Sequence, residues 1–418
     1  MKTIFTGFAP NLTKRDLSLA LRFLLSPRHW REWRRGEAVE SAERAIEAYL
    51  PVKHAIFFDS GRSALFFALR ALGVGEGDEV LLQAYTCVVV VNAVRWTGAA
   101  PVYVDVREDF TMDPDDLEKK ITAKSKVLII QHTFGLPAQM DRLLAGAKKH
   151  GLKVIEDCAQ SLGSSWQGQK LGTFGDLAIF SFGSDKGISC VRGGGVVTND
   201  TGLDERLRDD QRRLPTTPWL KIFQHLMHYP IFAFGKAYYH LGVGKWALWF
   251  AKKSGIINRI IYRPEKHGRQ VSFYPTQLPN ALAAILLLQL AELELIIKHR
   301  QWVTGQYQER LRQNTRVQSP PEQEGTVWLR FPLIVHDPRQ LHSLAKRQGI
   351  ILGDWYQTVI APGDVDMEKT GYRTVECPLA EALTSRSINL PTDRSIRAAE
   401  IERILVVIND YGRQINNK

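Results

Sequence analysis

The chain has 418 residues, of which 44% are hydrophobic and 24% charged, and its net charge is +11. This length and composition are typical of a globular protein with one large domain and a smaller one. The positive charge suits nucleic acid, an anionic membrane surface or phosphorylated substrates. The sequence contains no helix-turn-helix, zinc-finger or RNP motif, so we expect no nucleic-acid partner.

The four cysteines have neither zinc nor CxxC spacing, so we expect reduced thiols and no metal site. The first ten residues lack the apolar core and cleavage site of a signal peptide. No stretch approaches the ~20 apolar residues that span a bilayer. We therefore expect a cytoplasmic protein.

In chain order, residues 1–36 are predicted to form a basic amphipathic extension, and a helix is predicted over 37–49. A strand over 54–59 then leads through Ser60–Ser63 into a helix over 64–72. After this point strands and helices alternate. The strands are expected at 80–82, 101–106, 127–130 and 153–155, and the helices at 87–96, 113–120 and 137–150. This alternation predicts a mostly parallel sheet with helices on both faces and a ligand site at the carboxyl ends of the strands.

The pattern changes over residues 203–262, which are aromatic, basic and helical, and a strongly apolar helix is predicted at 283–295. Residues 325–418 alternate strand and helix again. We therefore predict a large domain over 37–295, with 203–262 as an insertion. A smaller C-terminal α+β domain is predicted over 296–418.

An acid and a lysine follow two of the predicted strands. Asp157 ends the strand that begins near Val154, and Lys186 follows the strand 177–182, flanked by Gly183 and Gly187. A pyridoxal phosphate enzyme needs such a pair, because the lysine forms a Schiff base with the aldehyde and the acid keeps the pyridine nitrogen protonated. A single lysine is most often a surface charge, and an acid at a strand end often caps a helix. The pairing favours the functional interpretation.

Nearby polar residues fit the same cofactor. Gln160 lies one turn beyond Asp157 and can reach the ring hydroxyl, although a plain polar loop residue explains its position nearly as well. The turn Ser60–Ser63 precedes a helix, whose N-terminus suits a phosphate, and Ser181 can add a hydroxyl. We expect His132 to be structural. No GxGxxG follows a strand and opens a helix, which disfavours a nicotinamide site.

Longer motifs extend this pattern. They are SGRSAL (60–65), GVGEGDEVLLQAYT (73–86), GAAPVYVDV (98–106), QHTFGLPAQM (131–140), VIEDCAQSLG (154–163), GTFGDLAIFSFGSDKG (172–187), GGVVTND (194–200) and SINLPTDRSI (387–396). With these motifs the chain resembles the DegT/DnrJ/StrS family of pyridoxal-phosphate sugar aminotransferases, of fold type I. The resemblance covers roughly residues 37–200 and 270–415.

The resemblance implies roles by position. Lys186 matches the Schiff-base lysine, Asp157 the acid at the pyridine nitrogen and Gln160 the polar partner of the ring. The remaining cofactor-binding residues that we predict are Gly61, Arg62, Ser63, Cys87 and Ser181. Because the lysine is retained, the resemblance implies transamination from a donor such as glutamate to a keto sugar, nucleotide-linked, in cell-surface polysaccharide or amino-sugar biosynthesis. It also implies a homodimer.

Three positions depart from the family pattern. Cys87 replaces the aromatic residue that usually stacks on the ring, and the run that starts at Arg192 lacks the family's acid. The loop 273–277, with Pro275 at its centre, lacks the asparagine expected to reach the cofactor phosphate of the partner subunit. Arg62 is expected to compensate, because a guanidinium suits phosphate oxygens.

The aromatic and basic residues of 217–253 suit an interfacial segment on an anionic membrane, and the Trp and Arg residues at 30–35 can act with it. A lid or a dimer contact explains the same residues. Three alternatives stay open at this point. One is a membrane-associated aminotransferase acting on a lipid-linked sugar, at the inner face of the membrane. The others are a non-catalytic or regulatory protein that keeps the fold, and a lyase or decarboxylase that acts on an amino acid.

Overall fold

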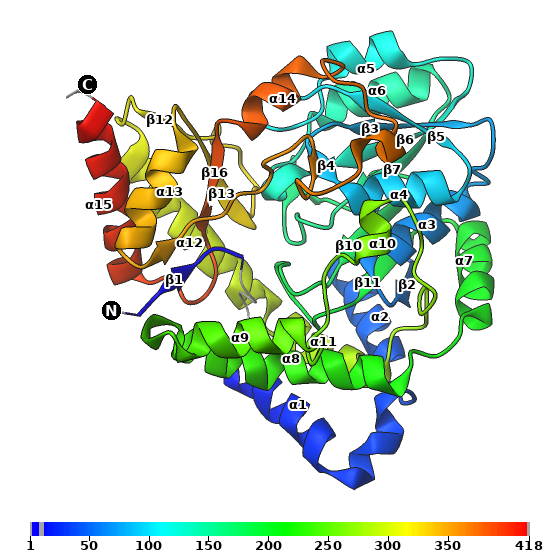
Figure 1. Ribbon diagram of the computed structural model, residues 1–418. Helices are drawn as coiled ribbons and strands as arrows, with labels where there is room; N and C mark the ends of the chain where they lie inside the picture. Colours follow the sequence, from blue (N-terminus) through cyan, green and yellow to red (C-terminus); the bar gives the residue numbers. More distant parts are fainter. Residues whose placement is uncertain (1, 8–11, 416–418) are drawn as a thin grey trace.

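A seven-stranded sheet organises the large domain in the computed structural model, which describes residues 2–7 and 12–415 (Figure 1). Its order is β2-β11-β10-β7-β6-β3-β5, and β11 runs antiparallel to both of its neighbours while the other pairs are parallel. The strands are β2 (His54–Phe58), β3 (Glu79–Gln83), β5 (Ala100–Val104), β6 (Ser125–Gln131), β7 (Lys153–Asp157), β10 (Leu177–Ser181) and β11 (Gly194–Thr198). The predicted mostly parallel sheet is confirmed.

Side chains alternate between the two faces of this sheet, as the two-residue period of a strand requires. Ile56 and Phe58 join one apolar cluster, and Ala55 and Phe57 join another on the opposite face. The first cluster packs under α3 (Gly61–Ala71), α4 (Val88–Trp96) and α7 (Thr201–Arg213). The second packs under α2 (Ala38–Tyr49) and α11 (Asn280–Ala291), and a third cluster packs under α5 (Pro114–Lys120) and α6 (Met140–Lys149). Helices therefore cover both faces.

The smaller domain is a three-stranded antiparallel sheet with helices. Its strands are β12 (Val317–Gln318), β13 (Arg330–Val335) and β16 (Ser387–Pro391), and its helices are α12 (Leu293–Leu311), α13 (Pro338–Arg347), α14 (Pro378–Thr384) and α15 (Ala398–Ile415). Short β4 (Thr86–Cys87) pairs with β15 (Ile360–Ala361), so the domains also meet through backbone hydrogen bonds. The remaining short elements are η2 (Thr133–Gly135), β8 (Ser165–Trp166), β9 (Gln169–Lys170), α10 (Arg263–Lys266), β14 (Ile350–Ile351) and η4 (Met367–Thr370).

The single apolar helix predicted at 283–295 is wrong, because two helices share this stretch. Helix α11 ends at Ala291, α12 begins at Leu293, and the pair is bent by 57°. Glu292 at the bend forms ion pairs with Arg15, at 3.1 Å, and with Arg394. In the described part of the chain, no single helix is long and apolar enough to span a membrane. Helices α11 and α12 meet these length and composition criteria only when they are taken together as a bent pair.

The N-terminal extension and the insertion pack together. Strand β1 (Ile4–Phe5) pairs with β14 of the smaller domain, and α1 (Lys14–Leu25) and η1 (Pro27–Trp33) follow. Helix α1 packs on α8 (Trp219–Ala237), which forms a hairpin with α9 (Val243–Lys253) through η3 (Tyr239–Leu241). Figure 1 shows α1, α8 and α9 together on one side of the molecule. Side chains at Gly235 or Gly244 would clash with the facing helix, so these glycines allow α8 and α9 to pack closely.

Candidate active site

The carboxyl ends of β7 and β10 meet at one cavity of about 620 Å³. Asp157 ends β7, and the parallel register places Ile179 of β10 beside it. Lys186 follows β10, half-buried, and its backbone N–H donates to the Gly183 carbonyl at 3.1 Å. Both Asp157 and Lys186 line the cavity. The structure therefore brings the predicted acid and amine into one space.

The carboxyl group of Asp157 is almost fully buried. Burial raises its pKa, and this effect is opposed by a hydrogen bond from the Ala159 N–H, at 3.0 Å, and by the positive charges of Lys186 and His132. A carboxyl group in this position can share a proton with a basic ring nitrogen. The arrangement fits the pyridine end of pyridoxal phosphate.

Glu156, one residue earlier on β7, points away from the cavity. Its carboxylate accepts backbone N–H groups from Gly172 at 2.9 Å, Phe174 at 2.6 Å and Gly175 at 2.9 Å. The His132 Nε2 lies 3.4 Å from the Glu156 Oε2, and the His132 Nδ1 accepts a hydrogen bond from the Ala138 N–H. These buried groups brace the loop 172–175, which agrees with the structural role expected for His132. Cys158 Sγ lies near the same two side chains, but the backbone donors already occupy both Glu156 oxygens.

The N-terminus of α3 supplies the other end of the cavity. Ser60, Gly61 and Arg62 line it together with Ser181 from β10. A Cβ on Gly61 would lie 2.9 Å from the Ser181 Cβ, so glycine lets the helix terminus approach this strand. The free N–H groups and positive dipole end of a helix bind phosphate well. The site therefore fits the phosphate of the cofactor as well as its ring.

Other predicted residues have partners within the protein. The Ser63 hydroxyl donates to Asp59 Oδ1 at 2.6 Å, and Ser63 is absent from the described cavity wall. Arg62 donates to the Ile260 carbonyl at 2.6 Å and to the Tyr274 hydroxyl at 3.2 Å, and it forms a buried ion pair with Glu265. Its guanidinium is thus shared between the cavity and these groups.

The positions that depart from the family pattern surround the same end. Arg192 forms an ion pair with Asp59 at 3.0 Å, and its guanidinium lies 4.2 Å from the centre of the Tyr274 ring. Tyr274 belongs to the loop 273–277 of the same chain. Cys87 lines the cavity, and burial raises the pKa of its thiol. Each arginine at this end of the cavity is therefore paired with an acid, Arg62 with Glu265 and Arg192 with Asp59.

Gln160 connects the two domains at the cavity. Its Oε1 accepts the Phe134 N–H at 3.0 Å, and its Nε2 donates to the Tyr356 hydroxyl at 3.0 Å. Tyr356 comes from the smaller domain and lines the cavity. Nothing in the sequence near Tyr356 marks it as a site residue, since its position depends on the docking of the two domains.

Sequence reasoning also missed Arg330. This fully buried residue of β13 pairs with Asp185 at 3.3 Å, and its guanidinium lies 3.5 Å from the centre of the Trp355 ring. Burial by itself would raise the pKa of Asp185, but the charges of Lys186 and Arg330 outweigh it and leave that pKa below its usual value. Because Asp185 precedes Lys186, the ion pair fixes the segment that carries the amine.

Helices α8 and α9 and the segment that follows them form one wall of the cavity. They contribute His228, Phe232, Tyr239, Lys245, Leu248, Trp249, Lys252, Ile257, Asn258, Arg259, Ile260 and Ile261. The insertion therefore belongs to the site. The sequence offered a lid as one of its explanations, although the spacing of these residues does not say which of them face the cavity.

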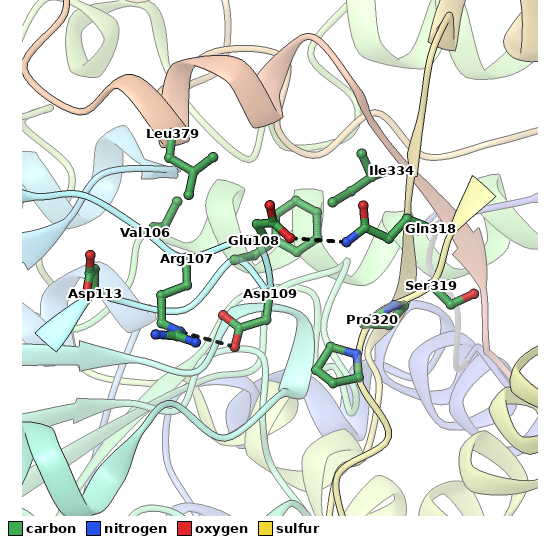
Figure 2. A pocket seen from close by; sticks show the side chains of 12 residues that line it. Val106, Arg107, Glu108, Asp109, Asp113, Gln318, Ser319, Pro320, Ile334 and Leu379 are labelled. Atoms are coloured by element: carbon green, nitrogen blue, oxygen red, sulfur yellow. Dashed lines mark hydrogen bonds and ion pairs between the residues drawn. The ribbon is translucent and has the colours of Figure 1, made fainter. Parts of the chain in front are cut away.

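A second cavity, of about 560 Å³, shares no lining residue with the first (Figure 2). It lies between the chain that follows β5 and residues 318–321. In Figure 2 the Gln318 side chain donates a hydrogen bond to the Glu108 carboxylate, and Arg107 forms an ion pair with Asp109. Its charged side chains thus have partners within the protein.

The fold and the first cavity define the class of a fold type I pyridoxal phosphate enzyme: a parallel sheet, an acid and a lysine at its carboxyl edge, and a helix N-terminus for the phosphate. The chain belongs to the DegT/DnrJ/EryC1/StrS aminotransferase family, whose model matches residues 27–229 and 253–409. It is thus a pyridoxal-phosphate-dependent aminotransferase, as the resemblance implied. Residues 230–252, between the matched ranges, carry the end of α8 and nearly all of α9.

Known relatives agree with this assignment. The chain is 31% identical to the UDP-N-acetyl-3-dehydro-alpha-D-glucosamine 3-aminotransferase of Acidithiobacillus ferrooxidans, over 87% of both proteins. It is 29% identical to the GDP-perosamine synthase of Escherichia coli O157:H7, over 90% of this chain and 91% of that protein. Among solved structures, DesV of S. venezuelae, in complex with a ketimine intermediate, matches 95% of this chain and 94% of its own, with a TM-score of 0.74 and 26% identity.

Proposed function

We propose that Lys186 is the catalytic residue of this aminotransferase and that the cofactor lies between it, Asp157 and the N-terminus of α3. The residues proposed to hold the cofactor are Gly61, Arg62, Ser63, Cys87, Asp157, Gln160, Ser181 and Lys186. The observation that carries the proposal is that Asp157 and Lys186 line one cavity together with Gly61 and Ser181. Ser63 does not line the cavity and acts indirectly: its hydroxyl donates to Asp59, which forms an ion pair with Arg192 of the cavity wall.

Pyridoxal phosphate, when bound, supplies the aldehyde and the electron-withdrawing ring on which amino-group transfer depends. Asp157 holds a proton at the ring nitrogen, which keeps the ring cationic. With the cofactor bound, Lys186 Nζ would accept and return a proton at the substrate carbon. Asp185, held by Arg330, keeps that segment in place.

Glutamate is the proposed amino donor and a carrier-linked keto sugar the proposed acceptor, in cell-surface polysaccharide or amino-sugar biosynthesis. The names of the relatives specify UDP- and GDP-linked sugars, which supports a nucleotide-linked keto sugar for this chain. The α8–α9 hairpin, which lies largely outside the family match, supports a second candidate. In that candidate the enzyme is membrane-associated and the keto sugar is linked to a lipid.

The same proposal includes a cytoplasmic homodimer that touches the inner face of the membrane through residues 217–253. The family resemblance supports the dimer, and the exposed aromatic residues of the hairpin support the membrane contact. Light scattering would reject the dimer if the holoenzyme had the mass of a monomer. Co-sedimentation with phosphatidylglycerol vesicles at low salt tests the contact, and unbound protein would reject it.

The half-reaction tests the catalytic assignment. Glutamate added to the holoenzyme should abolish the visible absorbance of the bound cofactor, and a keto sugar should restore it. The variant Lys186→Arg, which keeps the positive charge but is a far weaker base, is the matched control and should not respond. An unchanged spectrum in the wild-type protein would contradict the proposal.

A further inference from the structure

Much of the cavity wall built by α8 and α9 lies outside the family match. The family model matches the chain on both sides of residues 230–252 but not within them. These residues supply Phe232, Tyr239, Lys245, Leu248, Trp249 and Lys252 to the cavity that also holds Lys186. What distinguishes this chain from the family pattern thus lies against the proposed reaction site.

This wall carries positive charge without acidic neighbours in sequence. Between Asp210 and Glu265 the chain has no aspartate or glutamate, but it has nine lysines and arginines. Lys245 and Lys252 lie on the same face of α9, about two turns apart. Both line the cavity, as does Arg259. Such a wall attracts an anionic group such as a diphosphate.

His228 on α8 gives independent evidence of a polar ligand. The side chain is 5% exposed and lines the cavity, and neither ring nitrogen has a hydrogen-bond partner among the described residues. Its ring stacks on Phe232 with centroids 3.8 Å apart. Burial lowers the pKa of His228 to about 3, so the ring is neutral near pH 7 and offers one donor and one acceptor. Buried polar groups normally have a partner, and a bound ligand can supply it.

The outer side of the same hairpin is apolar. Trp246, Trp249 and Phe250 recur at helical spacing along α9 and are each exposed by half or more. Trp249 also lines the cavity, so the apolar surface continues from the cavity wall to the outside of the molecule. Tyr238, Leu241 and Val243 at the tip of the hairpin extend the exposed apolar surface. A water-soluble nucleotide would leave these side chains without a partner.

We infer that the α8–α9 wall binds the carrier of the keto sugar, and that this carrier is a lipid diphosphate drawn from an anionic membrane. The inference rests on the aminotransferase proposed above and decides between its two acceptor candidates. Lys245, Lys252 and His228 meet the diphosphate. Trp249 and the apolar outer surface meet the lipid chain, where aromatic and basic residues favour the membrane interface.

A second copy of the chain explains the hairpin less well. Two such hairpins facing each other across a two-fold axis would bring like charges together, since the segment 211–264 contains only basic charged residues. An anionic bilayer has the complementary charge.

Calorimetric titration of the holoenzyme with three soluble probes tests the inference. Farnesyl diphosphate should bind at least about tenfold more tightly than UDP or inorganic diphosphate, because it alone offers both an anionic head and an isoprenoid chain. Tighter or equal binding of UDP would overturn the inference in favour of a nucleotide carrier. The absence of binding by all three probes would also overturn it.

Variants separate the two parts of the wall. Trp249→Ser should weaken the binding of farnesyl diphosphate by about tenfold and leave the binding of inorganic diphosphate unchanged. The double variant Lys245→Gln/Lys252→Gln should weaken the binding of both probes. Trp302→Ser, a change at an exposed tryptophan of α12, is the control and should leave all affinities unchanged. Equal effects of Trp249→Ser and Trp302→Ser on the binding of farnesyl diphosphate would contradict the proposed contact between Trp249 and the lipid chain.

The glutamate half-reaction, measured on the same holoenzyme, separates this inference from the proposed function. Bleaching by glutamate together with preferred binding of UDP would leave the aminotransferase standing and reject only the lipid carrier. Preferred binding of farnesyl diphosphate without bleaching would reject the catalytic assignment.

Discussion

Two adjacent acids on β7 should respond to substitution in opposite ways. Glu156 faces the loop 172–175 and accepts three backbone N–H groups, while Asp157 faces the cavity and accepts one. We expect Glu156→Gln to destabilise the protein, with any loss of activity following from that. Asp157→Asn should abolish activity with little change in stability.

The magnitude follows from the hydrogen bonds. In Glu156→Gln an amide NH2 replaces one oxygen, so the Gly172 N–H or the pair from Phe174 and Gly175 loses its acceptor. A buried donor left unpaired costs about 1–3 kcal/mol, and the remaining bonds lose the contribution of the charge, roughly another 1–2 kcal/mol. We expect a total of about 3 kcal/mol. Asp157→Asn keeps an acceptor for the Ala159 N–H and removes a buried charge, so the cost should stay under about 1 kcal/mol.

Thermal unfolding of the cofactor-free protein checks both values. At roughly 2 °C per kcal/mol for a domain of this size, Glu156→Gln should lower the melting temperature by about 6 °C and Asp157→Asn by less than about 2 °C. The transamination rate of Asp157→Asn should fall by at least about 100-fold, since the ring nitrogen loses its acid. The same melting temperature for the two variants would refute the reasoning, as would an Asp157→Asn variant that retains most of the wild-type activity.

Three further outcomes are expected. Lys186→Ala should lose both the visible absorbance of the bound cofactor and turnover, and persistent turnover would exclude this lysine. Gly61→Ala should weaken cofactor binding by about tenfold in a spectroscopic titration, because its Cβ would lie 2.9 Å from the Ser181 Cβ; Gly75→Ala, which meets no atom within 4 Å, should bind normally. In the cofactor-free protein, burial raises the pKa of Asp157 in the folded state above its pKa in the unfolded state. The protonated carboxyl group therefore stabilises the wild-type fold at pH values below the unfolded-state pKa. This stabilisation is lost as the pH rises through the folded-state pKa. The melting temperature of Asp157→Asn relative to wild type should therefore increase from about pH 4 to about pH 7, and a constant difference would contradict the raised pKa.

The sequence predicted the parts of the fold that depend on local pattern. Strands β3, β6 and β7 and their intervening helices follow from alternating apolar runs, and Asp157 and Lys186 follow from strand ends. The break at Glu292 was not predictable from hydrophobicity, because apolar residues continue on both sides of it. Its ion pairs with Arg15 and Arg394 come from remote parts of the chain.

Site residues whose position depends on long-range packing also escaped prediction. Tyr356 reaches Gln160 across 196 positions in the sequence, and Arg330 reaches Asp185 across 145. The partners of Arg62 are equally remote, since Glu265 and Tyr274 approach it only after the segment that follows the hairpin has folded against α3. Local sequence carries no signal for such contacts.

The pairing of β1 with β14 has a consequence for the design of expression variants. The Ile4 and Phe5 backbone covers the edge of Ile350–Ile351, and the Phe5 ring contacts Tyr239 at the hairpin tip with centroids 4.8 Å apart. Gly7 lines the same cavity as Lys186. Deleting the first dozen residues would uncover a strand edge and remove part of the cavity wall in one step. Affinity tags and fusion partners are therefore better attached after α15 than before Ile4.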